Sequence, residues 1–566
     1  MKSYQLKYLI MFALMLTLFA CSIAAQQAAT SATALIVAPS PSPTPSPSPT
    51  PSPASTPSDS SEHERLLLER IEKLEKRLAD LETHPAKPED PARTNADNPL
   101  TPNSTTAAKG AIKSPSAADL SNPDSMNSVP PLLSGIKQED ATAKKKKSEP
   151  FAFADWSWLT GNARTKELAA DTPLFTPEIR FDVNYTSSFN HPKDNTIGGS
   201  SEVFRSGEFQ VTQIGIGGDF HYDNVRGRLM TQFGMYSQTT PRNDASPGRG
   251  QWNLDNAYRY VAEAYGGYHF DKLHGINVDA GIFMSYVGLY SYYQFDNWSY
   301  QPSYVSSNTP WFFNGVRVQI FPSDKLKIEP WIINGWQSYG KFNRAPGVGG
   351  QILYRPNSKT SITLNNYWGT DTLGNPDRKR IHTDDSIQYK YYDKPERFLD
   401  KAAFTLTIDA GCEYGGGVSC HGGKPNSPAQ YFLGFMAYNR FWFKKDLFAL
   451  TLGGGAINNP GRYLVLIPPI NGATALSGTP YFTANPGDKY KAYDASITFD
   501  YMPSQYVTFR GEYNQRGSNV PYFSGAGGIT PPGGNTFGAP GSFVPGFAPD
   551  LVKQERRYTM ALLVKW

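Results

Sequence analysis

The sequence predicts an all-β fold: a transmembrane antiparallel up-and-down β-barrel of about 16 strands, preceded by a disordered Pro-rich segment and a short coiled coil. Three observations support this prediction. Strand-like alternation continues from about residue 177 to the C-terminus, and short and long connections alternate along it. Aromatic residues make up 13% of the 566 residues, yet the mean hydropathy is −0.46. Amphipathic strands joined by long loops produce this combination.

The first segment, residues 1–25, has the pattern of a secretory signal peptide. An apolar run, LIMFALMLTLF, follows Lys2 and Lys7, and SIAAQ offers a small-residue cleavage site after Ala25. The stretch LFAC leaves open an alternative, the lipidation of Cys21. No later run reaches the roughly 18 apolar residues that a spanning helix needs. An exported chain of this kind crosses a membrane only as a closed barrel.

The next segments have the composition of an extended arm. Alternating Pro and Ser predict a semi-rigid linker over residues 26–61. Heptad spacing predicts a short coiled coil over 62–84, with a single amphipathic helix as the alternative. The heptad positions are Leu67, Ile71, Leu74, Leu78 and Leu81. A disordered linker is expected over 85–150, and a periplasmic lead-in segment over 151–176.

The barrel is expected over residues 177–566. Its strand-like segments lie near 178–187, 208–222, 225–237, 258–270, 275–287, 311–321, 325–337, 347–354, 360–368, 382–392, 402–411, 430–443, 447–457, 492–501, 506–515 and 556–566. The alternation of short and long connections is typical of outer-membrane barrels, whose tight turns face the periplasm. The pattern is weakest at 347–354 and 360–368, so the predicted count holds to within two strands.

Several long stretches resemble one protein family. They include FTPEIRFDVNYTSSFNHPKD, SSNTPWFFNGVRVQIFPSDKLKIEPWIINGWQSY and FLDKAAFTLTIDAGCEYGGGVSC. These stretches are similar to the OmpL-like β-barrel porin family (β-barrel porin-2), and the similarity covers roughly residues 151–566. The resemblance implies an outer-membrane porin without enzymatic chemistry, and it implies no particular site residue. The last strand ends on Trp566, an aromatic position that resembles the signal read by the barrel-assembly machinery.

The lumen is the expected functional site, because a barrel of about sixteen strands is wide enough to hold water. The polar strand faces predict its lining charges. These are Arg180, Asp182, Arg226, Arg228, Arg259, Glu263, Arg317, Lys327, Glu329, Lys390, Asp409, Asp500, Arg510 and Glu512. Mixed signs with a slight basic excess favour small polar solutes, with a modest preference for anions. The alternative is that the charges only solvate the wall and pair with one another.

The third long loop, residues 288–310, is the candidate constriction, because porins commonly fold a loop inward at this place. The loop is rich in Tyr and contains one charged residue. Its candidate residues are Tyr290, Tyr292, Tyr293, Asp296, Trp298 and Tyr300. Aromatic side chains along a pore can stack on sugars, so a carbohydrate path is one option. The alternative is an external loop packed by its own aromatic side chains.

Cys412 and Cys420 lie in one Gly-rich stretch, GCEYGGGVSC. In an exported protein a disulfide is favoured over two free thiols. No CxxC or HxxxC pattern accompanies them, and the eight His are scattered. HExxH, GxSxG and phosphate-loop motifs are absent from the sequence. We therefore expect no catalytic, cofactor-binding or metal site and no enzymatic activity.

These observations lead to three hypotheses on function. The first is an outer-membrane porin: a water-filled channel for passive diffusion of small polar solutes and ions, with its N-terminal arm in the periplasm. The second is a structural envelope protein whose arm contacts the cell wall, and the third is a surface adhesin. Expected partners are outer-membrane lipid, the assembly machinery through Trp566 and, as an option, two further copies in a homotrimer. A net charge of +4 gives no reason to expect nucleic acid.

Overall fold

The computed structural model describes Lys76 and residues 149–198, 200–290, 292–422, 429–460, 463, 489–527 and 550–566. The predicted signal peptide, coiled coil and linkers lie outside the described residues, apart from Glu149, Pro150 and Lys76, which is helical and exposed. The described residues from 149 to 566 belong to one compact unit of the chain.

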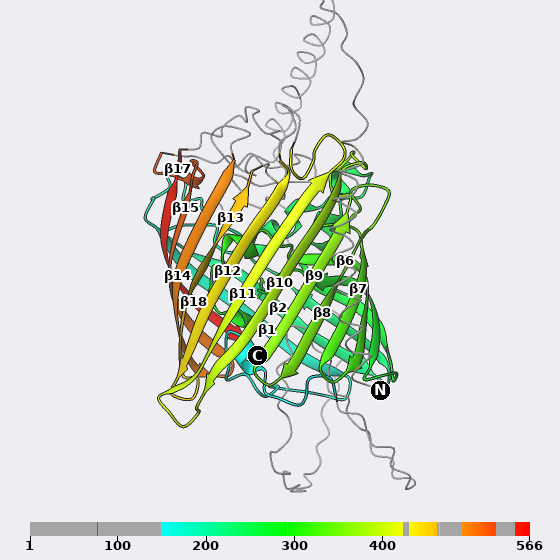
Figure 1. Ribbon diagram of the computed structural model, residues 1–566, viewed down its shortest axis with the longest axis vertical. Helices are drawn as coiled ribbons and strands as arrows, with labels where there is room; N and C mark the ends of the chain where they lie inside the picture. The colour runs from blue at the N-terminus through cyan, green and yellow to red at the C-terminus, as the bar shows by residue number, and fades with distance from the viewer. Residues whose placement is uncertain are drawn as a thin grey trace, which may run out of the picture. The chain divides into compact units, whose positions relative to one another are not determined.

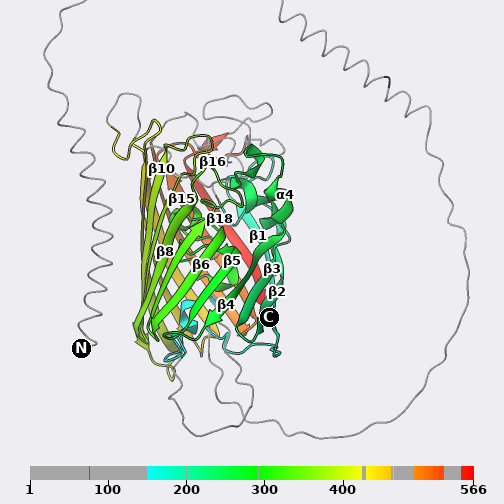
Figure 2. The ribbon, with the colours of Figure 1, turned by 90° about the vertical axis from the view of Figure 1, so that its right-hand side faces the viewer.

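Sixteen strands form one closed antiparallel barrel, which confirms the predicted fold and strand count. Figures 1 and 2 show the tilted strands as a continuous wall. The strands are β1 (Phe175–Ser188), β2 (Glu208–Tyr222), β3 (Val225–Thr231), β4 (Val261–Phe270), β5 (Ile276–Met284), β6 (Phe312–Ser323), β7 (Leu326–Ile333), β8 (Gly347–Asn357), β9 (Thr360–Gly369), β10 (Lys379–Asp393), β11 (Leu399–Tyr414), β12 (Tyr431–Phe443), β13 (Phe448–Asn459), β14 (Tyr490–Ser504), β15 (Val507–Ser518) and β18 (Gln554–Lys565). Both weakly patterned segments form strands, β8 and β9.

Short elements occupy the connections. They are η1 (Ser157–Leu159), α3 (Tyr236–Thr239), η2 (Pro241–Asn243), η3 (Ser246–Gly248), α4 (Leu254–Tyr258), η4 (Gln294–Asp296), α5 (Tyr304–Ser307) and a two-stranded sheet of β16 (Phe523–Ser524) and β17 (Leu551–Val552). Within the described part of the chain, no helix has the length and apolar character needed to span a membrane.

The strands form because apolar and polar side chains alternate along them. On β14, Ile497 and Phe499 are half-exposed on the outside of the barrel, whereas Thr498 and Asp500 are buried on the inside. The backbone groups of such a wall are satisfied between strands, so its apolar outer face can contact hydrocarbon. Lipid thus takes the place that a second protein layer would have in a soluble sandwich.

The two ends of the barrel differ. Tight turns join β2 to β3 and β14 to β15, and the turn residue Asp223 adopts a positive φ of 54°, which Asp tolerates better than most residues. The longer connections that the structure describes, such as those from β1 to β2 and from β3 to β4, leave the wall at the opposite end. β18 closes the wall by pairing with β1, where the backbone N–H groups of Ile179 and Trp566 donate to each other's carbonyl oxygens at 2.6 and 2.9 Å.

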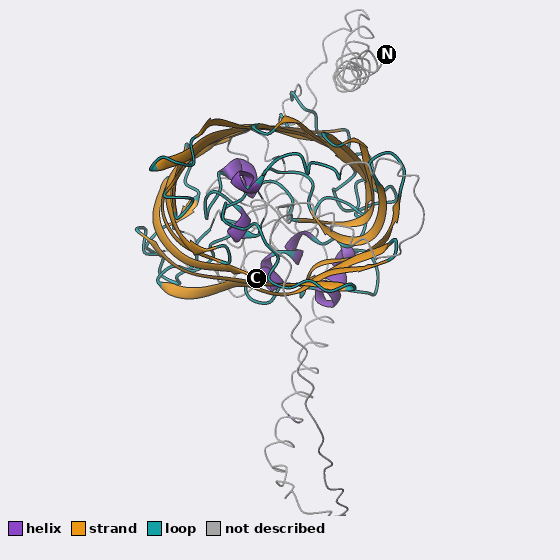
Figure 3. Cartoon of the chain, turned by 90° about the horizontal axis from the view of Figure 1, so that it is seen from below, coloured by secondary structure: helices purple, strands orange, loops and turns teal. Residues whose placement is uncertain are grey.

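The interior is packed with side chains. Figure 3 shows loops and short helices inside the ring of strands. A large buried cluster combines strand residues, such as Phe283, Trp331 and Trp442, with loop residues, such as Trp298 and Trp336. The core of this protein therefore lies within the lumen.

Candidate functional site: the barrel lumen

Thirteen of the fourteen predicted lining charges lie on strands, and each is buried within the barrel. They are Arg180, Asp182, Arg226, Arg228, Glu263, Arg317, Lys327, Glu329, Lys390, Asp409, Asp500, Arg510 and Glu512. Arg259 is the exception. It caps the C-terminal end of α4 before β4 begins, and its guanidinium lies 5.8 Å from the centroid of the Tyr260 ring. The residues just before Val261 form a helical turn, so strand alternation starts later than the sequence suggested.

Ion pairs join the charges on the wall from β1 to β6. The Arg228 guanidinium contacts the carboxylates of Glu178, Asp219 and Glu263, each at 2.9 Å. On β5, the Asp279 carboxylate lies 3.0 Å from Arg317 on the neighbouring strand β6 and 3.4 Å from Arg226 on β3. Burial removes the hydration of these groups, and the opposite charges compensate for that loss.

A second network lies on β12, β14 and β15. The Asp500 carboxylate forms ion pairs with the guanidinium groups of Arg440 and Arg510, each at 2.7 Å. The same two arginines also donate to loop carbonyls, including the bond from Arg440 to the Trp298 oxygen at 3.1 Å. Arg440 was not among the predicted residues. The signal that could have identified it is its own charge, because an arginine on the outer face of a strand would contact lipid.

The loop 288–310 lies inside the lumen and contacts the wall opposite its own strands. Asp296 forms an ion pair with Arg180 on β1 at 2.7 Å. The Tyr300 hydroxyl donates to Asp182 at 2.8 Å, and its backbone N–H donates to Glu512 at 2.6 Å. All six named residues of this loop are buried.

The aromatic members of this loop pack on aromatic residues that the sequence did not single out. Tyr290 lies 5.4 Å from Tyr438, and Trp298 lies 5.5 Å from Trp442, measured between ring centroids. Tyr292 and Tyr293 instead pack on each other, and the Arg180 guanidinium lies over the Tyr293 ring at 4.0 Å. β12 carries aromatic residues on both faces, so hydrophobicity alone could not show which ones point inward.

The segment Phe151–Thr165, called the strap below, also lies within the barrel. It is the first part of the predicted lead-in segment and begins beside the short turns, where the Phe151 N–H donates to the Asp324 oxygen at 2.7 Å. Trp156 and Trp158 are buried. At its other end, the Asn162 side chain donates to Thr508 Oγ1 at 3.1 Å. The strap and the loop 288–310 together fill much of the lumen.

The predicted lining charges differ in the small fraction of each residue that is exposed to solvent. Lys390 is 9% exposed and Arg226 is 8% exposed, whereas Asp500 is fully buried. The predicted lining charges with the larger exposed fractions lie on the wall from β3 to β10, called the open wall below. The wall from β12 through β15 and β18 to β1, called the covered wall, lies under the loop 288–310.

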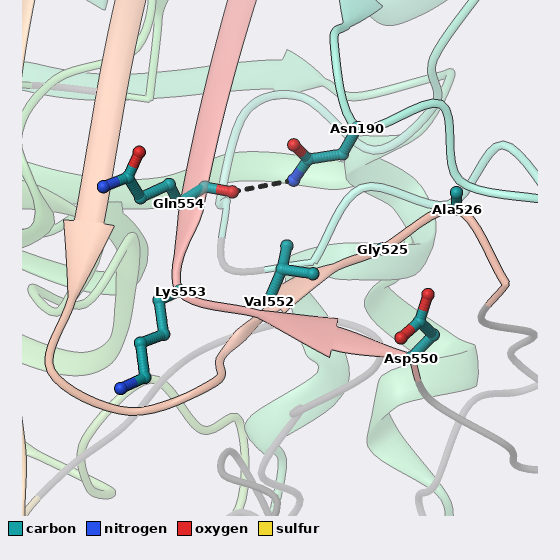
Figure 4. Close-up of a pocket in the computed structure, with 7 residues that line it drawn as sticks. All are labelled: Asn190, Gly525, Ala526, Asp550, Val552, Lys553 and Gln554. Carbon is teal, nitrogen blue, oxygen red and sulfur yellow. Dashed lines mark hydrogen bonds between the residues drawn. The ribbon is translucent and has the colours of Figure 1, made fainter.

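Two features lie at the long-loop end. Cys412 and Cys420 form a disulfide with their Cα atoms 5.3 Å apart. An open pocket of about 470 Å³ lies between β16, β17 and the loop after β1. Figure 4 shows its lining residues: Asn190, Gly525, Ala526, Asp550, Val552, Lys553 and Gln554. The Asn190 side chain donates to the Gln554 carbonyl at 2.9 Å, which closes one side of the pocket.

Known structures with a similar chain trace are outer-membrane proteins. OmpT of Vibrio cholerae is 11% identical, and the match covers 71% of this chain and all of that one with a TM-score of 0.39. The outer-membrane channel DcaP of Acinetobacter baumannii is 13% identical, with 69% and 96% covered and a TM-score of 0.38. The anion-selective porin from Comamonas acidovorans is 9% identical, with 69% and 99% covered and a TM-score of 0.41. Identities this low do not indicate a shared solute.

The sequence itself matches one family. No curated protein sequence matches the chain. Residues 181–539, more than half of the chain, match the family described as "Putative beta-barrel porin-2, OmpL-like". The matched region begins in β1 and includes every later barrel strand except β18. The chain therefore belongs to this OmpL-like family of outer-membrane β-barrel porins.

Proposed function

We propose that the protein is a channel for the passive diffusion of small polar solutes and ions across the outer membrane. The observation that carries the proposal is the ionisable inner face of a closed sixteen-strand wall, narrowed by an inward-folded loop. Pore width and lining charge determine what such a path admits. The side chains that we assign to this role are the thirteen buried strand charges named above.

The solute path in this proposal follows the open wall. Six cationic side chains on this wall keep some exposure: Arg226, Arg228, Arg317, Arg355, Arg380 and Lys390. Glu263 is the acidic residue with comparable exposure among the predicted charges. A basic excess at the least covered part of the lumen supports a modest preference for anions. The residual exposures are small, which supports a narrow channel for small solutes.

Planar bilayers test the proposal. Purified protein inserted into a bilayer should give stepwise conductance. In a salt gradient, the reversal potential should have the sign expected for an anion-selective pore. The double variant Arg226→Gln/Arg317→Gln should shift the reversal potential toward the value of a cation-selective pore. Arg556→Gln, which changes an exposed arginine on β18, should leave it unchanged. Silent bilayers with verified insertion would exclude the channel. Sugars added as blockers distinguish a carbohydrate path from general diffusion.

Three further points are proposals of their own. A periplasmic arm, its contact with the cell wall and recognition of Trp566 by the assembly machinery each rest on the sequence. Cross-linking in native membranes tests the arm contact and also the homotrimer. The arm that the envelope-anchor hypothesis requires lies almost entirely outside the described residues.

A further inference from the structure

We propose that the strap, Phe151–Thr165, is a displaceable plug that determines the width and ion preference of the channel. This inference rests on the proposed channel function and adds to it an element that controls the periplasmic half of the lumen. Figure 1 shows the strap in cyan at the end of the barrel that carries the short turns.

The strap runs between opposite sides of the ring of strands. Phe151 contacts the turn between β6 and β7 through its backbone bond to Asp324. At the other end, the Thr165 hydroxyl donates to the Gln505 oxygen in the turn between β14 and β15 at 2.7 Å. Eight of the sixteen strands around the barrel separate these two turns, so they lie on opposite sides of it. A segment with these two attachments limits access to the lumen from the periplasmic end.

Along its course the strap covers cationic side chains of the open wall. The Arg355 guanidinium lies 4.5 Å from the Trp156 ring centroid and 4.8 Å from that of Phe151. The Lys390 ammonium lies 5.8 Å from the centroid of the Trp158 ring. Aromatic rings hold cations in this way and cover one side of each. Departure of the strap would expose the covered side of both cations, which already border the open wall.

The strap also contacts the constriction loop. The Arg440 guanidinium donates to the Gly161 oxygen at 2.6 Å and to the Trp298 oxygen of the loop at 3.1 Å. The Gly161 N–H donates to the Asp296 oxygen at 2.9 Å. A Cβ atom at Gly161 would collide with the carbonyl oxygen of Asn297. Only glycine therefore allows the strap to approach the loop this closely.

Three features make the strap removable. The barrel closes without it, because no strand pairs with it. Among the described residues, its backbone makes two hydrogen bonds to other backbone groups of the barrel, those of Phe151 and Gly161. Phe151 also has a φ of 63°, a left-handed conformation that is unfavourable for a bulky side chain and is relieved on release.

Two loosened variants of the full-length mature protein test the inference in planar bilayers. Gly161→Ala adds one methyl group at the contact with the loop, and Trp156→Ala/Trp158→Ala removes both buried indoles. Each variant should increase the unit conductance by about a factor of two and shift the reversal potential toward greater anion selectivity. Trp252→Ala, which removes an exposed tryptophan of a long loop, is the matched control and should leave both unchanged.

A cysteine clamp separates displacement from a simple loss of side-chain volume. Asn162→Cys/Thr508→Cys joins positions whose side-chain atoms lie 3.1 Å apart, and it is added to Trp156→Ala/Trp158→Ala. The oxidised clamp should return the conductance toward the wild-type value, and reduction should restore the larger value. Trp156→Ala/Trp158→Ala without the clamp receives the same reductant as a control for the native disulfide.

The outcomes separate the two proposals. Folding of each variant is verified by heat-modifiable migration in gels. If wild-type and loosened proteins conduct equally, or if the clamp does not reverse the increase, the plug is excluded and the channel remains. If all inserted proteins are silent, the channel itself is excluded. A silent wild type with conducting loosened variants supports the plug but contradicts passive diffusion through the unmodified protein.

Discussion

The loop 288–310 and the strap both fill the lumen, yet different chemistry holds them. Charged strand residues hold the loop: Arg180 pairs with Asp296, and the Asp494 carboxylate accepts a hydrogen bond from Ser303 at 2.8 Å. Aromatic packing and a few hydrogen bonds hold the strap, which has a single covalent connection to the wall through β1. The loop is thus a fixed part of the wall, whereas the strap can leave as a unit.

The largest effect should follow removal of a loop anchor. In Arg510→Ala, the Asp500 carboxylate loses one of its two arginines, and carbonyl oxygens of Gln294, Asn297 and Ser299 lose their donor. Because a buried charge then loses its partner, we expect a loss of about 3–5 kcal/mol in the free energy of unfolding. Thermal unfolding in detergent measures it. Arg556→Ala, which changes an exposed arginine on β18, serves as the control, and equal stabilities of the two variants would contradict a loop held by charges.

A smaller effect is expected from Tyr300→Phe. The Tyr300 hydroxyl donates to Asp182 and accepts from the Asn184 side chain at 2.7 Å. Its removal leaves buried polar groups with fewer partners, which should lower the free energy of unfolding by about 1–3 kcal/mol. Tyr493→Phe changes a lipid-facing tyrosine and should have no effect. Equal losses in the two variants would show that the buried hydroxyl contributes nothing specific.

A pH-dependent effect is expected at Glu202, in the loop after β1. Burial raises the pKa of Glu202 above its ordinary value. The folded state therefore loses stability as the pH rises through the raised pKa, because it must then hold a buried negative charge. Glu202→Gln should stabilise the barrel at about pH 8 and change little at about pH 3, where the carboxyl is largely protonated in both states. Unfolding at both pH values measures this, with exposed Glu167→Gln as control.

The smallest effect on unfolding is expected from Trp156→Ala. Truncation of a buried tryptophan in a protein core typically costs about 3–5 kcal/mol. The strap can detach before the wall unfolds, so we expect a change in barrel unfolding below about 1 kcal/mol. A loss as large as that of Arg510→Ala would show that the strap and the wall unfold together, and would remove the contrast between strap and loop.

Strand alternation made the barrel predictable from the sequence, and it even located β8 and β9, where the pattern was weak. Parity also predicted the burial of thirteen charged residues on strands, because a charged side chain on an outward face would contact lipid. It failed at Arg259, where a helical turn precedes the strand. It also could not assign Phe432 or Trp442, since an aromatic side chain suits either face of β12.

The burial of the strap could not be predicted. In the stretch FAFADWSWLTGN, the alternation of Phe151 and Phe153 changes phase before Trp156 and Trp158, so no continuous period indicates one buried face. Its partners, such as Arg355 and Arg440, are hundreds of residues away along the chain. Only the closed barrel brings those side chains to one place, and a local pattern does not contain that information.

Asp296 has a kinetic consequence for assembly. Its carboxylate contacts Arg180 on β1 at 2.7 Å and Lys565 on β18 at 3.4 Å, two strands from opposite ends of the chain that meet at the seam. The loop can reach its final position only after this seam has joined, because half of its docking site does not exist earlier. Contacts of such long sequence separation form slowly. Docking of this loop should therefore be a late event in biogenesis, and a nascent barrel should pass through a stage in which its interior is still wide.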